Sequence, residues 1–140
     1  MAIQEFKPGR FFIGRIPLQA DLLTAVYDLC REHSIECASF AINGVVLSAT
    51  LGTYDQKQKV YVTAREAGPL DILSCSGNLI NRENRFGIHA DIVLSGLAGK
   101  TTGGRLFSPT TVLAGEVELT EFRGKLLDQF YDAETGLFLW

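Results

Sequence analysis

Apolar side chains recur along this chain with two different periods, and the period predicts where helix and strand lie. Over 20–33 (ADLLTAVYDLCREH) they return every three or four positions, as on the buried face of an amphipathic helix. That face carries Leu22, Val26 and Leu29. Asp21 lies near the start, where a carboxylate suits the exposed N–H groups, and His33 lies in the last turn, where a cation is favoured. We expect a helix here, and a helix-end role for His33 in place of a catalytic one.

Short apolar runs separated by turn residues make up most of the remaining chain and predict strands. They cover 9–16, 36–42, 44–52, 59–66, 70–80, 87–95 and 111–122. Asn43-Gly44 marks a turn or a bulge between two of these runs. One helix followed by many strands favours an α+β fold, in the wider α/β class, with a mainly antiparallel sheet flanked by helices. No linker or repeat interrupts the pattern, so we expect a single domain over 1–140.

The final six residues, 135–140 (TGLFLW), are apolar on both faces of an extended segment. Leu137 and Leu139 point one way, and Phe138 and Trp140 point the other. A segment that is apolar on both sides is poorly suited to solvent. It is either covered by the fold or docked on another subunit, which is a first indication of oligomerisation.

Composition and charge narrow the classes of function. The chain has 140 residues, 46% of them hydrophobic, and a formal net charge of -3, so it is globular and lacks the basic excess of a free-standing DNA-binding protein. No apolar run is long enough to span a membrane, and the charged N-terminus does not resemble a signal peptide. We therefore expect a cytoplasmic protein.

The cysteines predict free thiols. Cys30, Cys37 and Cys75 are odd in number and scattered, with no CxxC spacing. This pattern argues against a disulfide framework and against a metal site made of thiolates.

A polar trio follows in the segment 88–106 (IHADIVLSGLAGKTTGGRL). His89 and Asp91 are two residues apart and share one face of the predicted strand. If the glycine-rich connection folds back as a symmetric hairpin centred near Ala98, Arg105 lies opposite Asp91 on that same face. The spacing thus predicts a cross-strand pair between Asp91 and Arg105.

Four interpretations of this trio remain open, and the spacing favours the last. Gly99-Lys100-Thr101 matches the end of a phosphate-binding loop, but Leu94 stands where that motif needs glycine. A metal would have only His89 and Asp91, because a guanidinium offers donors alone. Acid–base or nucleophilic chemistry lacks a nucleophile motif such as GxSxG. The fourth interpretation is an ion pair inside a hairpin or a subunit interface.

Six stretches in the right order resemble the PPC domain family, the "plants and prokaryotes conserved" domain. They are the segment 88–106, the helix 20–33 followed by IECASFAINGVV (35–46), LGTYD (51–55), LSCSGNLI (73–80), AGEVELTEF (114–122) and DAETGLFLW (132–140). The resemblance implies a compact α/β domain on an antiparallel sheet that assembles as a homotrimer, with a DNA-associated or regulatory role. Plant members carry an R-G-R-P arm that enters the DNA minor groove. This chain has only GRIP at 14–17, inside a predicted strand.

The departures from the family pattern concern its metal site. In many prokaryotic members three histidines hold a metal, and the matching positions here are His89, Asp91 and Arg105. Two ligand positions have become opposite charges, so our hypothesis is that a charge pair has replaced the metal. We therefore expect no cofactor, no metal and no catalytic residue. If a metal were found, His89 and Asp91 would be its ligands.

The favoured function is a non-catalytic, homotrimeric interaction or regulatory domain. The polar pocket around His89, Asp91 and Arg105 is expected between subunits, where it would take a small anion with Arg105 and Arg15 as donors. Asn78 either lines this pocket or caps a turn.

Two other classes of function are kept as alternatives. Arg82, Arg85 and Lys100 on loops would form one basic patch for direct DNA binding. The resemblance also implies a fold like that of zinc-dependent acetolactate decarboxylases, so a metal- or ligand-dependent enzyme is the second alternative.

Overall fold

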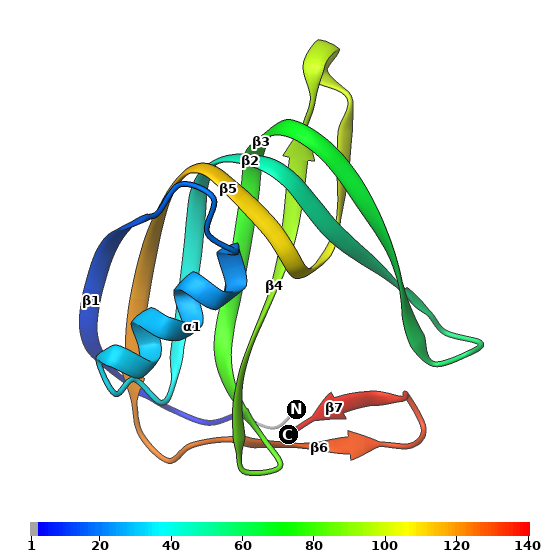
Figure 1. The fold of residues 1–140 in the computed structure, drawn as a ribbon. Helices are drawn as coiled ribbons and strands as arrows, with labels where there is room; N and C mark the ends of the chain where they lie inside the picture. The colour runs from blue at the N-terminus through cyan, green and yellow to red at the C-terminus, as the bar shows by residue number, and fades with distance from the viewer. Residues whose placement is uncertain (1–2) are drawn as a thin grey trace.

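Seven strands, one α-helix and one short 3₁₀ turn make up residues 3–140, the part of the chain that the computed structural model describes (Figure 1). In chain order they are β1 (Lys7–Ile16), α1 (Leu22–Glu32), β2 (Ala38–Asp55), β3 (Val60–Arg82), β4 (Arg85–Ser95), η1 (Leu97–Gly99), β5 (Thr101–Arg123), β6 (Asp128–Asp132) and β7 (Leu137–Leu139). The predicted antiparallel sheet is confirmed except for β6, which pairs with β3 in parallel. The predicted flanking helices reduce to α1 within these residues, because the other connections are tight turns.

Two strands, β2 and β3, are each longer than the runs that the sequence pattern predicts. The runs 36–42 and 44–52 form the single strand β2, with a register shift between Ala41 and Gly44. Gly44 has a φ of 139°, and a Cβ there would lie 2.1 Å from the carbonyl oxygen of Ala114. Asn43-Gly44 is therefore a bulge and not a turn, and glycine is needed because β5 passes so close. The runs 59–66 and 70–80 merge in the same way into β3.

The sheet closes on itself around its long strands. β4 pairs with β3 through Asn78 and His89, and with β5 through Asp91 and Arg105. β5 in turn pairs with β2, and β2 with β3. β1 adds to the other side of β5 and is an edge strand. β5 thus contacts three strands and fixes the registers of β1, β2 and β4, while β3 takes its register from β2 and β4.

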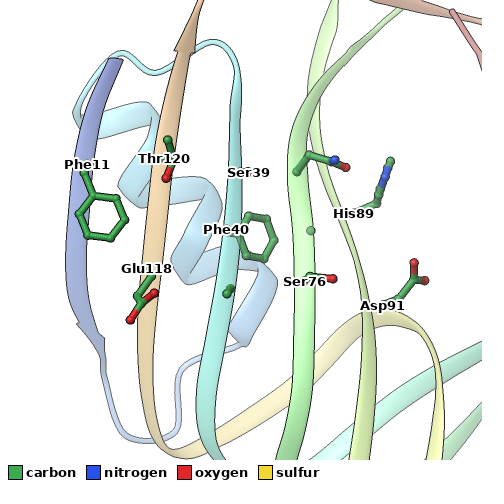
Figure 2. A pocket seen from close by; sticks show the side chains of 11 residues that line it. Phe11, Ser39, Phe40, Ser76, His89, Asp91, Glu118 and Thr120 are labelled. Atoms are coloured by element: carbon green, nitrogen blue, oxygen red, sulfur yellow. The ribbon is translucent and has the colours of Figure 1, made fainter. Parts of the chain in front are cut away.

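The helix α1 covers one face of the sheet and is fastened to β5. In Figure 2 it passes behind the strands, on the side opposite to most of the side chains drawn. It buries Leu22, Val26 and Cys30 in a core that includes Ile92, Leu94, Leu106 and Leu119. Asp21 caps the helix by accepting from the Thr24 backbone N–H at 3.1 Å, as the sequence predicts. The same carboxylate also accepts from the Thr110 backbone N–H at 2.7 Å, so one residue ties the helix start to the sheet.

The C-terminal hairpin of β6 and β7 is only partly covered. Leu139 and Trp140 are 48% and 53% exposed, while the ring of Phe138 lies 4.1 Å from the guanidinium carbon of Arg82. The fold therefore covers Leu137 and Phe138 in part and leaves the last residue of each face exposed, and docking of this segment on a second subunit stays a prediction.

The cysteines and the length of the helices bear on two expectations from the sequence. Cys30, Cys37 and Cys75 are free thiols, as predicted. No helix within residues 3–140 is long and apolar enough to cross a membrane.

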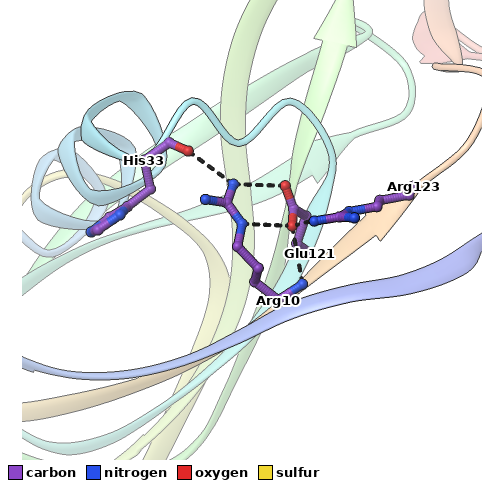
Figure 3. A network of polar contacts seen from close by, with 4 residues as sticks. All are labelled: Arg10, His33, Glu121 and Arg123. Carbon is purple, nitrogen blue, oxygen red and sulfur yellow. Dashed lines mark hydrogen bonds and ion pairs between the residues drawn. The ribbon is translucent and has the colours of Figure 1, made fainter.

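A charged network joins the edge strand β1 to β5 and to the end of α1 (Figure 3). The Arg10 guanidinium donates from Nε and Nη2 to the two carboxylate oxygens of Glu121, at 2.9 and 2.8 Å. The Arg10 backbone N–H donates to the same carboxylate at 3.0 Å. Nη2 also donates to the carbonyl of His33, the C-terminal cap of α1, at 2.9 Å. His33 thus has the predicted place at the helix end, while the cation that serves this end is Arg10.

These bonds make the fold sensitive to acid through Glu121. The bonds from Arg10 lower the pKa of the Glu121 carboxyl from its ordinary 4.5 to about 2. Because this pKa is depressed in the folded state, the stabilisation is complete above about pH 4.5 and is lost as the pH falls toward 2. We expect the melting temperature of the wild type to fall more steeply over this interval than that of Glu121→Gln. Parallel curves for the two proteins, measured by circular dichroism, would contradict this.

Candidate functional site

The sheet face opposite α1 carries a cleft of about 470 Å³ built from five neighbouring strands (Figure 2). Backbone register aligns its side chains in two rows across the sheet. The first row runs Phe11, Thr120, Ser39, Asn78 and His89. The second runs Ile13, Glu118, Ala41, Ser76, Asp91 and Arg105. The face is therefore apolar at the β1 edge, carries the Glu118 carboxylate on β5 and hydroxyl and amide groups in the middle, and ends in the charged residues of β4.

Asp91 and Arg105 form the predicted cross-strand pair. Their Cα atoms are register partners in β4 and β5, and Arg105 Nε donates to Asp91 Oδ1 at 2.7 Å. The hairpin turns at η1, where Ala98 has a φ of 63°, so its centre is the predicted one. The Asp91 side chain is 66% exposed and that of Arg105 only 25%, so the pair lies at the surface with its cation partly buried. Such a pair orients the two groups more than it stabilises the fold.

His89 lies beside this pair, and its side chain is partly buried. Its ring nitrogen Nδ1 is buried without a hydrogen-bond partner among the described residues. Burial lowers the pKa of His89, the nearby Arg105 and Arg82 guanidiniums lower it further, and Asp91 opposes them. The imidazole is therefore neutral at neutral pH and able to accept a hydrogen bond or a proton.

These residues do not fit the three-histidine metal site of the family. Asp91 is engaged by Arg105, and a guanidinium in the third position has no lone pair for a metal. Within residues 3–140 no three His, Cys, Asp or Glu side chains gather closely enough to hold an ion. Cys30 and Cys75 lie buried in the hydrophobic core, and burial raises the pKa of their thiols to about 11 and about 12.

The other sequence-predicted residues are distributed over the molecule. Asn78 lies opposite His89 in the middle of β3, so it lines the cleft and does not cap a turn. Arg15, on β1, is the register partner of Glu116 on β5 and does not line the cleft.

Arg82 and Arg85 are register partners at the β3–β4 turn, whereas Lys100 follows η1 at the opposite end of β4 (Figure 1). The eleven residues of β4 span about 35 Å. The expectation of one basic patch from all three is therefore wrong for a single chain.

Sequence reasoning missed two parts of this region. Glu118 and Thr120 belong to the cleft because β5 pairs with β2 in one particular register, which no local pattern encodes. Tyr61, Phe86 and Phe107 line a second cavity to which His89 also contributes. The alternation of side chains along a strand predicts which face of its own strand each aromatic residue occupies, but only the closed sheet brings residues of different strands together.

Comparison with protein families and solved structures identifies what this chain resembles. The family model described as the Plants and Prokaryotes Conserved (PCC) domain matches residues 3–123. The metal-containing protein AF0104 from Archaeoglobus fulgidus is 36% identical, with a TM-score of 0.93 over 100% of this chain and 99% of that one. A plant- and prokaryote-conserved (PPC) protein from Pyrococcus horikoshii is 26% identical, with a TM-score of 0.92 over 100% and 96%. No curated protein matches the chain.

Two more distant structures share the fold alone. A protein from Ralstonia eutropha JMP134, provisionally named a DNA-binding protein, is 24% identical with a TM-score of 0.79 over 91% of this chain and 88% of that one. Acetolactate decarboxylase from Bacillus subtilis subspecies spizizenii is 13% identical with a TM-score of 0.60. This chain covers 57% of the decarboxylase, and 89% of this chain is matched. The expected likeness of fold to these decarboxylases is confirmed.

The charges of Arg105 and Asp91 shift the pKa of His89 in opposite directions, and removing each charge tests this. Because Arg105 lowers this pKa and Asp91 raises it, Arg105→Gln raises it and Asp91→Asn lowers it. Titration of the imidazole signals by nuclear magnetic resonance measures both shifts, and His33 is the only other histidine to assign. Shifts of the same sign in the two variants would contradict the arrangement described here.

Proposed function

The chain belongs to the Plants and Prokaryotes Conserved domain family, and from this membership we propose that it is a non-catalytic, homotrimeric domain with a DNA-associated or regulatory role. The observation that carries the proposal is the Asp91–Arg105 pair, which occupies two positions where many prokaryotic members have histidine. A charge pair keeps the hairpin register but supplies no Lewis acid. The site then orients subunits or ligands and does no chemistry.

The sheet face opposite α1 supports self-association. Phe11 and Ile13 are 59% and 71% exposed on the edge strand β1, next to the polar rows of the cleft. Apolar side chains gathered on an uncovered sheet face mark an interaction surface. A second copy offers both apolar side chains and the half-exposed tail residues Leu139 and Trp140, so we assign the contact to copies of this chain.

Molar mass and metal content, measured on one tag-free sample, test the proposal. We expect a trimer of about 46 kDa, three times the 15.4 kDa chain, by light scattering. We also expect well under one metal ion per chain by elemental mass spectrometry, and about one zinc per chain in the double variant Asp91→His, Arg105→His, which restores a three-histidine set on the same hairpin. A wild type with about one metal per chain would overturn the replacement and place the enzyme alternative first.

A matched pair of variants locates the contact. Ile13→Glu puts a charge on the proposed face and should convert the trimer to monomer. Leu97→Glu makes the same change at the β4–β5 turn, where the side chain is 95% exposed, and should leave the trimer intact. Both sites are exposed, so neither change costs much folding stability. A monomeric wild type, or equal loss in both variants, would contradict the proposed interface.

Direct DNA binding receives less support from the structure. Arg82 and Arg85 are adjacent, but Lys100 is at the other end of β4, and the chain carries a net charge of -3. We expect no binding of duplex DNA even at about 50 mM salt, where phosphate contacts are strongest. The measurement is fluorescence anisotropy of a labelled duplex across a salt series. Affinity that falls steeply with salt and is lost in Arg82→Gln, Arg85→Gln would establish this alternative instead.

A further inference from the structure

A second cavity, of about 600 Å³, opens on the other side of His89 from the sheet-face cleft. The β3–β4 turn, β5 and the start of α1 enclose it. Three arginines line it, namely Arg82, Arg85 and Arg105, and the only carboxylate among its lining residues is Glu83. The cavity is thus positively charged in a protein whose net charge is negative. Its volume lies in the range of small-molecule sites.

Several donors in this cavity lack a partner. Arg105 donates from Nε to Asp91, and no hydrogen bond is formed by its remaining nitrogens within the described part of the chain. Arg82 Nε is a buried donor without a hydrogen-bond partner there, and His89 Nδ1, which donates or accepts according to its tautomer, is buried without a partner as well. Buried donors are rarely left unpaired, so an acceptor is expected at this point. A guanidinium fork suits phosphate or carboxylate oxygens best.

Flat apolar walls lie beside these donors. The rings of Tyr61 and Phe107 pack edge to face with centroids 5.5 Å apart, and the guanidinium carbon of Arg105 lies 5.6 Å from the Tyr61 ring centre. Phe86, the second residue of β4, is 40% exposed. Rings arranged around cations accept a planar ring by stacking.

We propose that this cavity binds a small organic phosphate that carries a planar ring, of the nucleoside monophosphate class. The phosphate lies against Arg82 and Arg105, and the ring stacks on Tyr61 and Phe86. This inference goes beyond the proposed function, because it requires neither the trimer nor the absence of catalysis.

His89 reports on such a ligand. It faces Arg82 from β3 and Arg105 from β5, while Asp91 on its own strand is the opposing charge. A phosphate between the two guanidiniums offsets their effect on the imidazole. Binding therefore raises the pKa of His89, and the signals of His33, at the far end of α1, stay in place.

The experiment titrates the full chain with adenosine monophosphate, and separately with inorganic phosphate and with adenosine. Isothermal calorimetry gives the affinities and nuclear magnetic resonance follows both histidines. We expect adenosine monophosphate to bind at least about tenfold more tightly than either fragment, because it alone satisfies both the guanidiniums and the rings. We also expect it to shift His89 and not His33. Equal affinity for phosphate alone would overturn the stacking part, and no shift of His89 would overturn the site.

Variants separate this cavity from general charge effects. Arg82→Gln and the exposed Arg85→Gln should each weaken binding of adenosine monophosphate at least about fivefold. Arg31→Gln removes a 72% exposed arginine from α1 and should change nothing. Asp91→Asn keeps Arg105 but frees its Nε, so binding should be unchanged or tighter. Equal weakening in Arg31→Gln and Arg85→Gln would show non-specific attraction and overturn the proposal.

Discussion

The register of β5 is the constraint on which the rest of this structure depends. β5 pairs with β1, β2 and β4, and through Thr110 it holds the capping residue of α1. Because side chains alternate between faces along a strand, a slip of one residue in β5 would turn its whole pattern over. Leu106 and Leu119 would leave the core, and Arg105 and Glu118 would enter it. The buried core thus fixes the cleft on the opposite face, and Phe40 belongs to both, since it lines the cleft and is buried in the core.

The sequence predicted what depends on local periodicity. The helix, its Asp21 cap and the Asp91–Arg105 partnership follow from spacing, because a hairpin of known centre leaves one register. The lengths of β2 and β3 were underestimated, since Gly44 and the segment around Gly68 look like strand ends when seen locally. They remain within strands because neighbouring backbones pass close enough to continue the ladder. Tertiary contact decides this, and no single-strand pattern contains it.

The sequence predicted the charged residues at the centre of the candidate site, but not the residues that other strands bring to it. His89, Asp91 and Arg105 come from one hairpin, so parity brings them together. Arg82, Tyr61 and Phe107 share a cavity with His89 only because β4 bridges β3 and β5 and closes the sheet. Lys100 failed to join Arg82 and Arg85 for a related reason: a long strand separates two turns that look equally loop-like in the sequence.

The likeness to a decarboxylase and the departure from a metal site have one physical explanation. The fold rests on backbone ladders and on apolar side chains such as Ile92 and Leu94, which point away from the cleft. Metal chemistry rests on the outward-facing side chains of the same hairpin, which the core does not constrain. The Asp91–Arg105 pair supplies a cross-strand attraction, so the proposed exchange of two histidines for these residues is compatible with the hairpin register. In the proposed replacement, Arg105 offers no lone pair to a metal, the Asp91 carboxylate is engaged by that guanidinium, and a fixed cation lies beside a neutral imidazole. A site of that kind is better suited to holding an anion than to activating water.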